Sequence, residues 1–140
     1  MKIALVALVV SFMMLGCVPT QYKIDNDVES NKYVQVVVND FIDYLRIEYK
    51  RGSWIKIEGG DGNQYISKLR ATAIRKGLKV CINKCPTNAV SFETLIERID
   101  GNLLEATLTT QKSIFHRIYK VNKNKKISRF GNKTVYRIKK

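Results

Sequence analysis

The stretch that decides the fold is residues 93–121, which read ETLIERID-GN-LLEATLTT-QK-SIFHRIYKV. Three runs rich in β-branched, aromatic and other apolar side chains are separated by the turns Gly101-Asn102 and Gln111-Lys112, as expected for consecutive β-strands. Strands joined by such short turns form an antiparallel meander. A polar turn at 122–126 and a further apolar run at 133–138 continue the pattern. The C-terminal half is therefore predicted to be a sheet.

Two amphipathic helices are predicted ahead of this sheet. Apolar side chains recur every three or four positions in residues 32–51, after a capping Ser30 or Asn31, and again in residues 63–76. Asp61 or Asn63 is the expected cap of the second helix, which Gly77 ends. The expected buried positions are Val34, Val37, Val38, Phe41, Leu45 and Tyr49 in the first helix, and Ile66, Leu69, Ala73 and Ile74 in the second.

Each helix is followed by a short predicted strand. In residues 53–58, Ile55 and Ile57 share one side. In residues 78–82 the alternation places Leu78, Val80 and Ile82 inward and Cys81 on the opposite face. The glycine-rich segment 59–62 between the units is expected to be a turn, since it lacks the Lys-Ser/Thr of a phosphate-binding loop. The order αβαβ followed by an antiparallel strand meander predicts an α+β fold, a two-layer sandwich with two helices packed on one face of a mixed sheet.

The N-terminus has the organisation of a bacterial lipoprotein signal peptide. Lys2 is followed by an apolar run, residues 3–15, that is shorter than the roughly 20 residues needed to span a bilayer. Gly16 and Cys17 then supply a small residue before the cleavage site and a thiol that accepts the lipid. We expect residues 1–16 to be removed and Cys17 to carry a membrane lipid. The alternatives are an ordinary signal peptide with an incidental cysteine, and a retained N-terminal helix.

Residues 17–31 are predicted to be the lipidated cysteine and a tether, with residues 32–140 forming a single globular domain. The tether is polar, yet Tyr22, Ile24 and Val28 are spaced apolar residues that a disordered tether does not require. These three side chains could add to a neighbouring protein as a strand or hook. A plain flexible tether is the alternative.

Two cysteines remain after Cys17. An exported protein occupies an oxidising compartment, where an even number of thiols tends to pair. Cys81 and Cys85 are therefore expected to form a disulfide, whose short loop contributes roughly 2 kcal/mol by chain entropy. Free thiols and a metal site are the alternatives, and a metal site would lack the four ligands that structural zinc requires.

The chain is strongly basic, with a formal net charge of +13. The charge concentrates in residues 106–140, which hold eleven Lys or Arg and no Asp or Glu. This part could face an anionic partner. The candidate residues for an anionic surface are Lys123, Lys125, Lys126 and Arg129. A solvated basic face is the alternative, and no nucleic acid is expected as a direct ligand because no recognition motif for one is present.

Few residues in this sequence could form a catalytic site. His116, the only histidine, would need a nearby thiol or a serine (Ser91, Ser113 or Ser128) to form a nucleophile–base pair, and it lies in the middle of a predicted strand. Two carboxylate pairs can also be formed. They are Glu93 with Glu97, and Asp40 with Asp43. The two aspartates lie three apart on the helix, opposite its apolar stripe, and are therefore expected to be solvated. We predict no enzymatic activity, no metal and no cofactor.

Partner binding is favoured by aromatic residues that alternate along the predicted sheet. Phe115 and Tyr119 share one face of residues 113–121, while Ile114, His116 and Ile118 share the other. Neither face is purely polar, so a sheet covered on one side only would expose apolar groups, which usually mark interaction sites. Phe115, Tyr119 and the strand residue Trp54 are candidate partner-binding residues. The alternative is that both faces are covered within the domain.

The whole predicted mature chain resembles a known family. Ser53-Trp54-Ile55-Lys56-Ile57, Leu69-Arg70, Lys76-Gly77-Leu78-Lys79-Val80 and Ser128-Arg129-Phe130 occur, after the lipoprotein signal, in an order similar to that of the TrbH-type conjugal-transfer lipoproteins. The resemblance covers most of residues 31–137. It implies a globular part similar to the small N-terminal domains of secretins.

The function implied by this resemblance is architectural. A lipid-anchored domain at the outer membrane, facing the periplasm, would pack beside a larger channel protein of a type IV secretion or conjugation machine. Ring-forming homo- or hetero-oligomers would follow from that role. The alternative is a stand-alone periplasmic or surface lipoprotein that binds an acidic protein, glycan or lipid.

Overall fold

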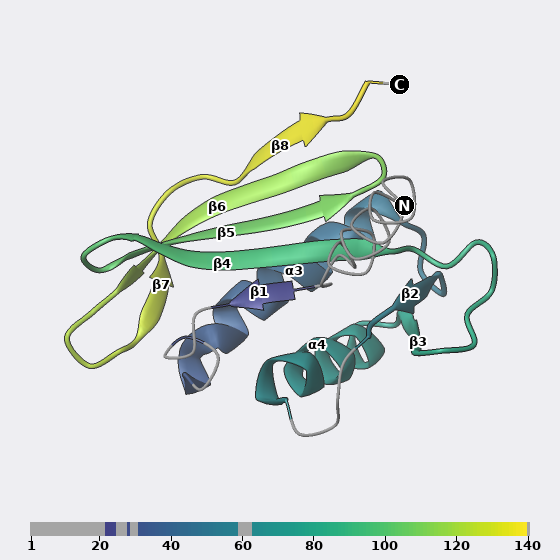
Figure 1. The fold of residues 1–140 in the computed structure, drawn as a ribbon, viewed down its shortest axis with the longest axis horizontal. Helices are drawn as coiled ribbons and strands as arrows, with labels where there is room; N and C mark the ends of the chain where they lie inside the picture. The colour runs from purple at the N-terminus through teal and green to yellow at the C-terminus, as the bar shows by residue number, and fades with distance from the viewer. Residues whose placement is uncertain (1–21, 25–27, 29–30, 59–62, 140) are drawn as a thin grey trace, which may run out of the picture.

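A computed structural model of the 140-residue chain describes residues 22–24, 28, 31–58 and 63–139 (Figure 1). Two α-helices and eight strands occur in these ranges. In chain order the elements are β1 (Tyr22–Ile24), the 3-10 helix η1 (Lys32–Val34), α3 (Gln35–Glu48), β2 (Trp54–Lys56), α4 (Gln64–Arg75), β3 (Lys79–Cys81), β4 (Phe92–Asp100), β5 (Leu103–Thr110), β6 (Ser113–Val121), β7 (Ile127–Arg129) and β8 (Thr134–Arg137).

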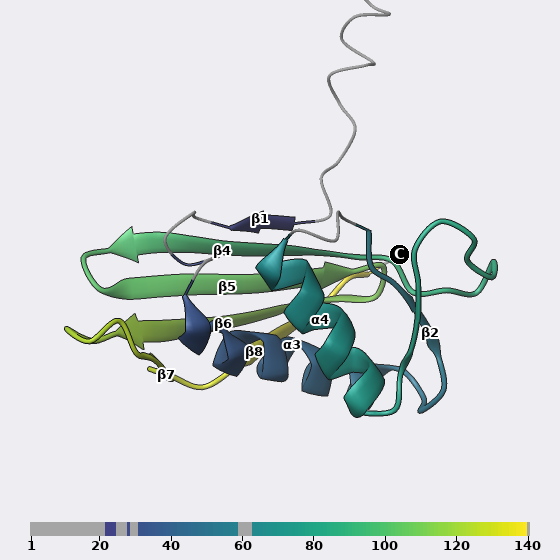
Figure 2. The ribbon, with the colours of Figure 1, turned by 90° about the horizontal axis from the view of Figure 1, so that it is seen from below.

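The molecule has two layers, with both helices on one face of the large sheet (Figure 2). The six-stranded sheet has the order β1-β4-β5-β6-β7, and β8 also pairs with β6. The predicted α+β class, with its two helices, mixed sheet and antiparallel meander, is confirmed. One detail differs from the expectation of a single mixed sheet: β2 and β3 pair in parallel with each other in a separate two-stranded sheet.

The meander follows the predicted strands closely. β5 and β6 have the expected bounds, and β4 begins one residue earlier, at Phe92. The polar segment after β6 turns the chain into β7, which apolar alternation did not predict but which coincides with the strand that the family resemblance implied at Ser128-Arg129-Phe130. β7 pairs with the end of β6 and β8 pairs with its beginning, both antiparallel. One long strand therefore supports two short ones along the same edge.

The first helix buries the predicted stripe. Val34, Val37, Val38, Phe41 and Leu45 are buried, and Tyr49 packs against the core from beyond the helix end. Asn31 caps the segment by accepting a hydrogen bond from the Tyr33 N–H, while Gly52 has a φ of 84° in the following turn. Ile42 and Tyr44 are also buried, and the Tyr44 ring packs against Phe115 of β6.

The second helix departs from its prediction at one position. Ile66, Leu69 and Ala73 are buried, but Ile74 is 61% exposed, so the expectation that it belongs to the core is wrong. Tyr65 and Thr72 complete the buried side instead, since the face that meets the core is rotated away from position 74. Asn63 caps the helix through the Ile66 N–H, and Gly77 ends it with a φ of 90°.

The strand after α4 alternates differently from the prediction. Leu78 and Cys81 are buried, Val80 is half-buried and Ile82 is 40% exposed. The predictions that Ile82 points inward and that Cys81 points outward are therefore wrong. The reason is that the regular strand covers only Lys79–Cys81, and Leu78 is buried from the turn that closes the helix. Cys81 forms the expected disulfide with Cys85, with 5.4 Å between the two Cα atoms.

The predicted tether contributes to the domain itself. Tyr22–Ile24 form β1, which pairs in parallel with β4 at the sheet edge, and Val28 is buried in the core. The Tyr22 ring packs against Tyr65, and its hydroxyl accepts a hydrogen bond from the Asn63 side chain. Tyr22, Ile24 and Val28 therefore make their contacts within this domain. The prediction was that they could add to a neighbouring protein as a strand or hook. The lipidation candidate Cys17 and the glycine-rich segment 59–62 lie outside the described residues.

Candidate functional site

The most densely bonded polar group is Asp40, on α3. Its carboxylate accepts hydrogen bonds from Arg129 at 2.5 Å, from Arg117 at 3.1 Å and from the Tyr119 hydroxyl at 2.6 Å. Two arginines and a tyrosine from β6 and β7 therefore converge on one helix side chain. We call these four residues the Asp40 cluster. It ties the helix layer to the end of the meander.

The expectation that Asp40 is solvated is wrong, because its side chain is only 7% exposed. Burial alone would raise the pKa of Asp40, but hydrogen bonds from Arg129 and Tyr119 and the charges of both arginines outweigh it, so the pKa lies below its usual value. Asp43 behaves as expected for a surface residue and forms an ion pair with Lys76. Asp40 and Asp43 thus do not form an acid–base pair.

The sequence contained a signal for this cluster that the prediction missed. Asp40 lies three residues after Val37 and four before Tyr44, both buried, which places it beside the apolar stripe. Arg117 lies between Phe115 and Tyr119 on the same side of β6. A carboxylate and an arginine, each at a position that the pattern assigns to the core, indicate a buried ion pair.

Three residues predicted to contact a protein partner or an anion instead make contacts inside the domain. Phe115 and Tyr119 are 1% and 0% exposed, so the proposal that they contact a partner is wrong. Phe115 packs edge-on against Phe41, and Tyr119 belongs to the Asp40 cluster. Arg129 is also committed to Asp40, although half of its side chain is exposed, and is no longer a free cation for an anionic surface.

The remaining predicted residues are accessible. Lys123, Lys125 and Lys126 are exposed on the turn between β6 and β7, where Lys125 has a φ of 62° and its carbonyl accepts a hydrogen bond from Asn31. Trp54 is half-buried with the ammonium of Lys79 5.5 Å from its ring centre. Binding of an anion or a partner by these residues stays a prediction.

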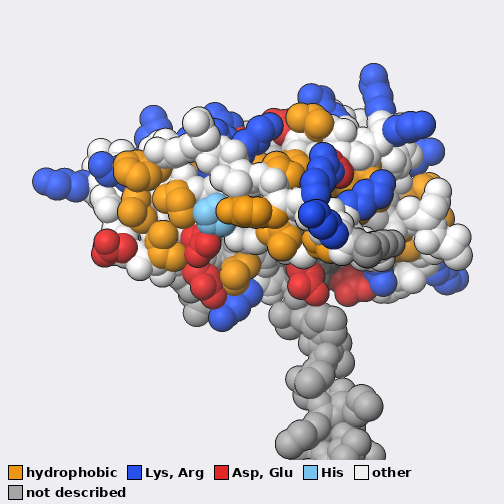
Figure 3. All heavy atoms as spheres, turned by 90° about the horizontal axis from the view of Figure 1, so that it is seen from above, with side chains coloured by type: hydrophobic (Ala, Val, Ile, Leu, Met, Phe, Trp, Pro, Cys, Tyr) orange, Lys and Arg blue, Asp and Glu red, His pale blue; other side chains and the backbone are white. Residues whose placement is uncertain are grey.

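The face of the large sheet that points away from the helices is uncovered by the described residues (Figure 3). We call it the outer face. It carries the half-buried apolar side chains of β4, β5 and β6 and one exposed tyrosine of β8, which are Leu95, Leu103, Ile114, Ile118 and Tyr136. His116 lies among them, as Figure 3 shows, and its Nε2 is 2.8 Å from a carboxylate oxygen of Glu105.

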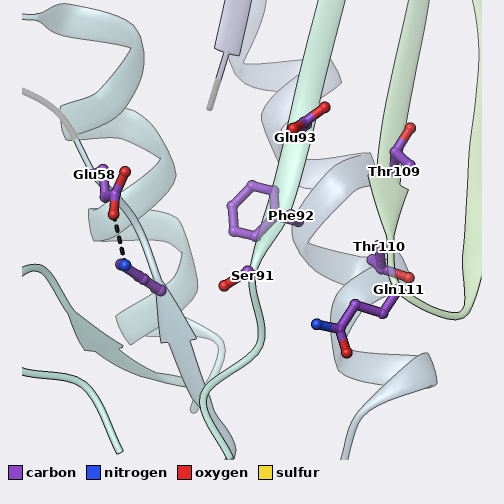
Figure 4. A pocket seen from close by; sticks show the side chains of 8 residues that line it. Glu58, Ser91, Phe92, Glu93, Thr109, Thr110 and Gln111 are labelled. Carbon is purple, nitrogen blue, oxygen red and sulfur yellow. Dashed lines mark ion pairs between the residues drawn. The ribbon is translucent and has the colours of Figure 1, made fainter. Parts of the chain in front are cut away.

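The catalytic candidates do not converge. Ser113 is buried and bonded to the Tyr44 hydroxyl on the inner side of β6, whereas His116 points to the outer face. Ser91 lines a pocket of about 340 Å³ between β2 and the adjoining ends of β4 and β5 (Figure 4). Lys56 and Glu58 form an ion pair on one wall of that pocket, and Phe92 of β4 is another of its lining residues. Glu97 pairs with Lys23.

A second cavity of about 300 Å³ lies next to the Asp40 cluster. Its walls are formed by α3, by the inner side of β6 and by the segment leading into β8. Arg46 and Ile47 of the helix, Arg117 of β6 and Lys133 contribute to it. Three cationic side chains therefore line this cavity together with the two carboxylates already described.

Comparisons with known proteins give no identification. No protein-family model matches the chain, and no curated protein and no solved structure is significantly similar to it. Among the described residues there is no group of three or more potential metal ligands. No helix in the same ranges is long and apolar enough to cross a membrane.

Proposed function

We propose that this chain is a lipid-anchored structural component of a type IV secretion or conjugation machine. In this role Cys17 holds the domain at the outer membrane, and the domain packs beside a larger channel protein in the periplasm. The proposal rests on the lipoprotein signal, on the resemblance to TrbH-type lipoproteins and on an interaction surface of the folded domain.

The observation that carries the proposal is the outer face. A small domain normally covers its apolar sheet surface, and a contiguous uncovered one marks a contact with another protein. Here the half-buried Ile118 lies diagonally across from Leu103 on the neighbouring strand, and the half-buried Ile114 pairs with the exposed Tyr136 at the edge. Glu105 lies opposite Ile118, 2.8 Å from the His116 Nε2, and Lys120 lies opposite Leu103, so the face combines apolar and charged groups as protein interfaces do.

Site-specific photo-crosslinking in the native bacterium tests this proposal. A crosslinking amino acid at position 118 should capture a channel-forming outer-membrane protein, and Cys17→Ser should abolish that product because the domain leaves the membrane. The matched control is position 74, which is exposed on the helix side and should give no such product. Equal products from both positions, or none from position 118, would overturn the proposal. Capture of a protein without channel components would favour a stand-alone binding lipoprotein.

A further inference from the structure

We infer that the open edge of β8 binds an extended acidic segment of a partner protein by strand addition, and that a carboxylate of this segment enters the cavity between Arg46 and Lys133. This site is separate from the outer face and does not depend on the proposed secretion role. It is carried by the charge of the cavity and by the hydrogen-bonding pattern of the edge strand.

The cavity is positively charged once its internal pairs are counted. Asp40 is neutralised by Arg129 and by Arg117, and Asp43 is neutralised by Lys76 at 2.5 Å. Arg46 and Lys133 also line the cavity, and neither has an acidic partner in the part of the chain that the structure describes. Lysine and arginine side chains without a counterion are the groups that bind carboxylates.

The wall of the cavity is apolar beside these cations. Ile47 is 72% exposed on α3, and Phe115 forms the opposite side on β6. A volume of about 300 Å³ holds one or two side chains. An acidic peptide with apolar neighbours fits this combination of charge, shape and apolar surface. A membrane surface fits it less well, since lipid headgroups meet flat or convex basic faces more readily than a recessed cavity.

The edge of β8 offers the backbone groups that such a peptide needs. Ile138 donates its N–H to Lys112, so the alternation of an antiparallel ladder turns Thr134 and Tyr136 toward β6 and leaves the groups of Val135 and Arg137 facing outward. β8 is the outermost strand at this side of the molecule (Figure 1). Exposed strand edges bind extended peptides by adding a strand.

The position of Val135 connects the two features. Val135 pairs with Phe115 and therefore lies on the side of β8 that faces the cavity. A peptide strand added along β8 would place alternate side chains on that same side. Its carboxylates would then point toward Lys133 and Arg46, while its backbone bonds to Val135 and Arg137. Residues 106–140 contribute no Asp or Glu to this site, and the two carboxylates of α3 that line the cavity are ion-paired with Arg117, Arg129 and Lys76.

Fluorescence anisotropy with the full chain in detergent tests the inference. The probe is a short, capped and labelled peptide that alternates valine with glutamate, and the control peptide has glutamine in place of glutamate. The glutamate peptide should bind at low salt, and the glutamine peptide should bind about tenfold more weakly. Equal affinity for the two peptides would overturn the carboxylate site.

Three variants separate the components of the site. Arg46→Gln with Lys133→Gln should weaken binding about tenfold, whereas Lys79→Gln, which removes an exposed lysine remote from the cavity, should leave it unchanged. Val135→Pro removes an outward N–H without touching the β6 ladder and should also abolish binding. Unchanged affinity in either cavity or edge variant would contradict the proposal.

Two further measurements identify other outcomes. Ile118→Ser, on the outer face, should leave peptide binding intact, so failure of the proposed function and failure of this site are distinguishable. Flotation with phosphatidylglycerol vesicles tests the lipid source of the anion. If the Arg46→Gln, Lys133→Gln variant loses vesicle binding while the wild-type chain ignores the peptide, the cavity binds lipid phosphate and the peptide site is wrong.

Discussion

The two faces of β6 differ in their contacts: the helix layer covers the inner face, and no described element covers the outer face. On the inner face, Phe115 packs against α3, and Arg117 and Tyr119 are bonded to Asp40. On the outer face, Ile114 and Ile118 are only half-buried and no described element covers them. The inner polar groups are therefore satisfied within the chain and serve its stability. The outer apolar groups leave surface for a contact with another molecule.

The largest expected effect is on the free energy of unfolding, which should fall much more for a substitution on the inner face of β6 than for one on the outer face. Phe115→Ala removes a fully buried ring that contacts both Phe41 and Tyr44, and should lower the free energy of unfolding by about 4 kcal/mol. Ile114→Ala, the adjacent residue on the outer face, should cost about 1 kcal/mol because its side chain is already partly solvated. Urea unfolding measures both. Similar losses for the two variants would show that the outer face is also part of the core.

The second effect concerns the polar part of the inner face. Asp40→Ala leaves two arginines and the Tyr119 hydroxyl without their shared acceptor, and should cost about 3 kcal/mol. Asp43→Ala is the matched control on the same helix, and its partly exposed pair with Lys76 should be worth about 1 kcal/mol or less. If the two variants are equally stable by chemical denaturation, the Asp40 cluster does not hold the layers together.

The pH dependence of stability gives a third, smaller effect. The pKa of Asp40 is lowered in the folded protein, so its contribution is present above the unfolded value of about 3.9 and is lost as the pH falls through the folded value. The stability difference between wild type and Asp40→Asn should therefore shrink on acidification below about pH 4. Thermal unfolding at a series of pH values measures this difference. A constant difference down to pH 2 would mean that Asp40 does not titrate as the cluster requires.

The same comparison explains what could be predicted from the sequence. Alternation along residues 93–121 and helical spacing in residues 32–51 predicted the meander and α3, because both patterns follow directly from burial of one side. The two faces of β6 were separated correctly by this alternation. The face that meets the helices was assigned wrongly when Phe115 and Tyr119 were predicted to contact a partner, since both faces carry apolar residues and the choice depends on long-range packing.

The errors concern short elements and polar residues. β1, with three residues, and the exposed Ile74 depend on tertiary contacts that no local pattern contains. Asp40 was assigned to the surface because it was placed opposite the apolar stripe of the helix, and its partners Arg117 and Arg129 lie 77 and 89 positions away along the chain. A buried charge becomes predictable only when its distant counterions are known.

The substitution with the smallest expected effect on stability is the one expected to affect assembly most. Ile118→Ser replaces a half-buried side chain on the outer face, and should change the free energy of unfolding by less than about 1 kcal/mol. If the outer face contacts a channel protein, a hydroxyl at this position lacks a partner in a desolvated interface and weakens the contact. The yield of complex after detergent solubilisation should fall severalfold, while Ile74→Ser, on the exposed side of α4, should leave it unchanged. Equal yields from the two folded variants would show that the open face of β6 is ordinary surface, and that the contrast between its faces concerns the fold alone.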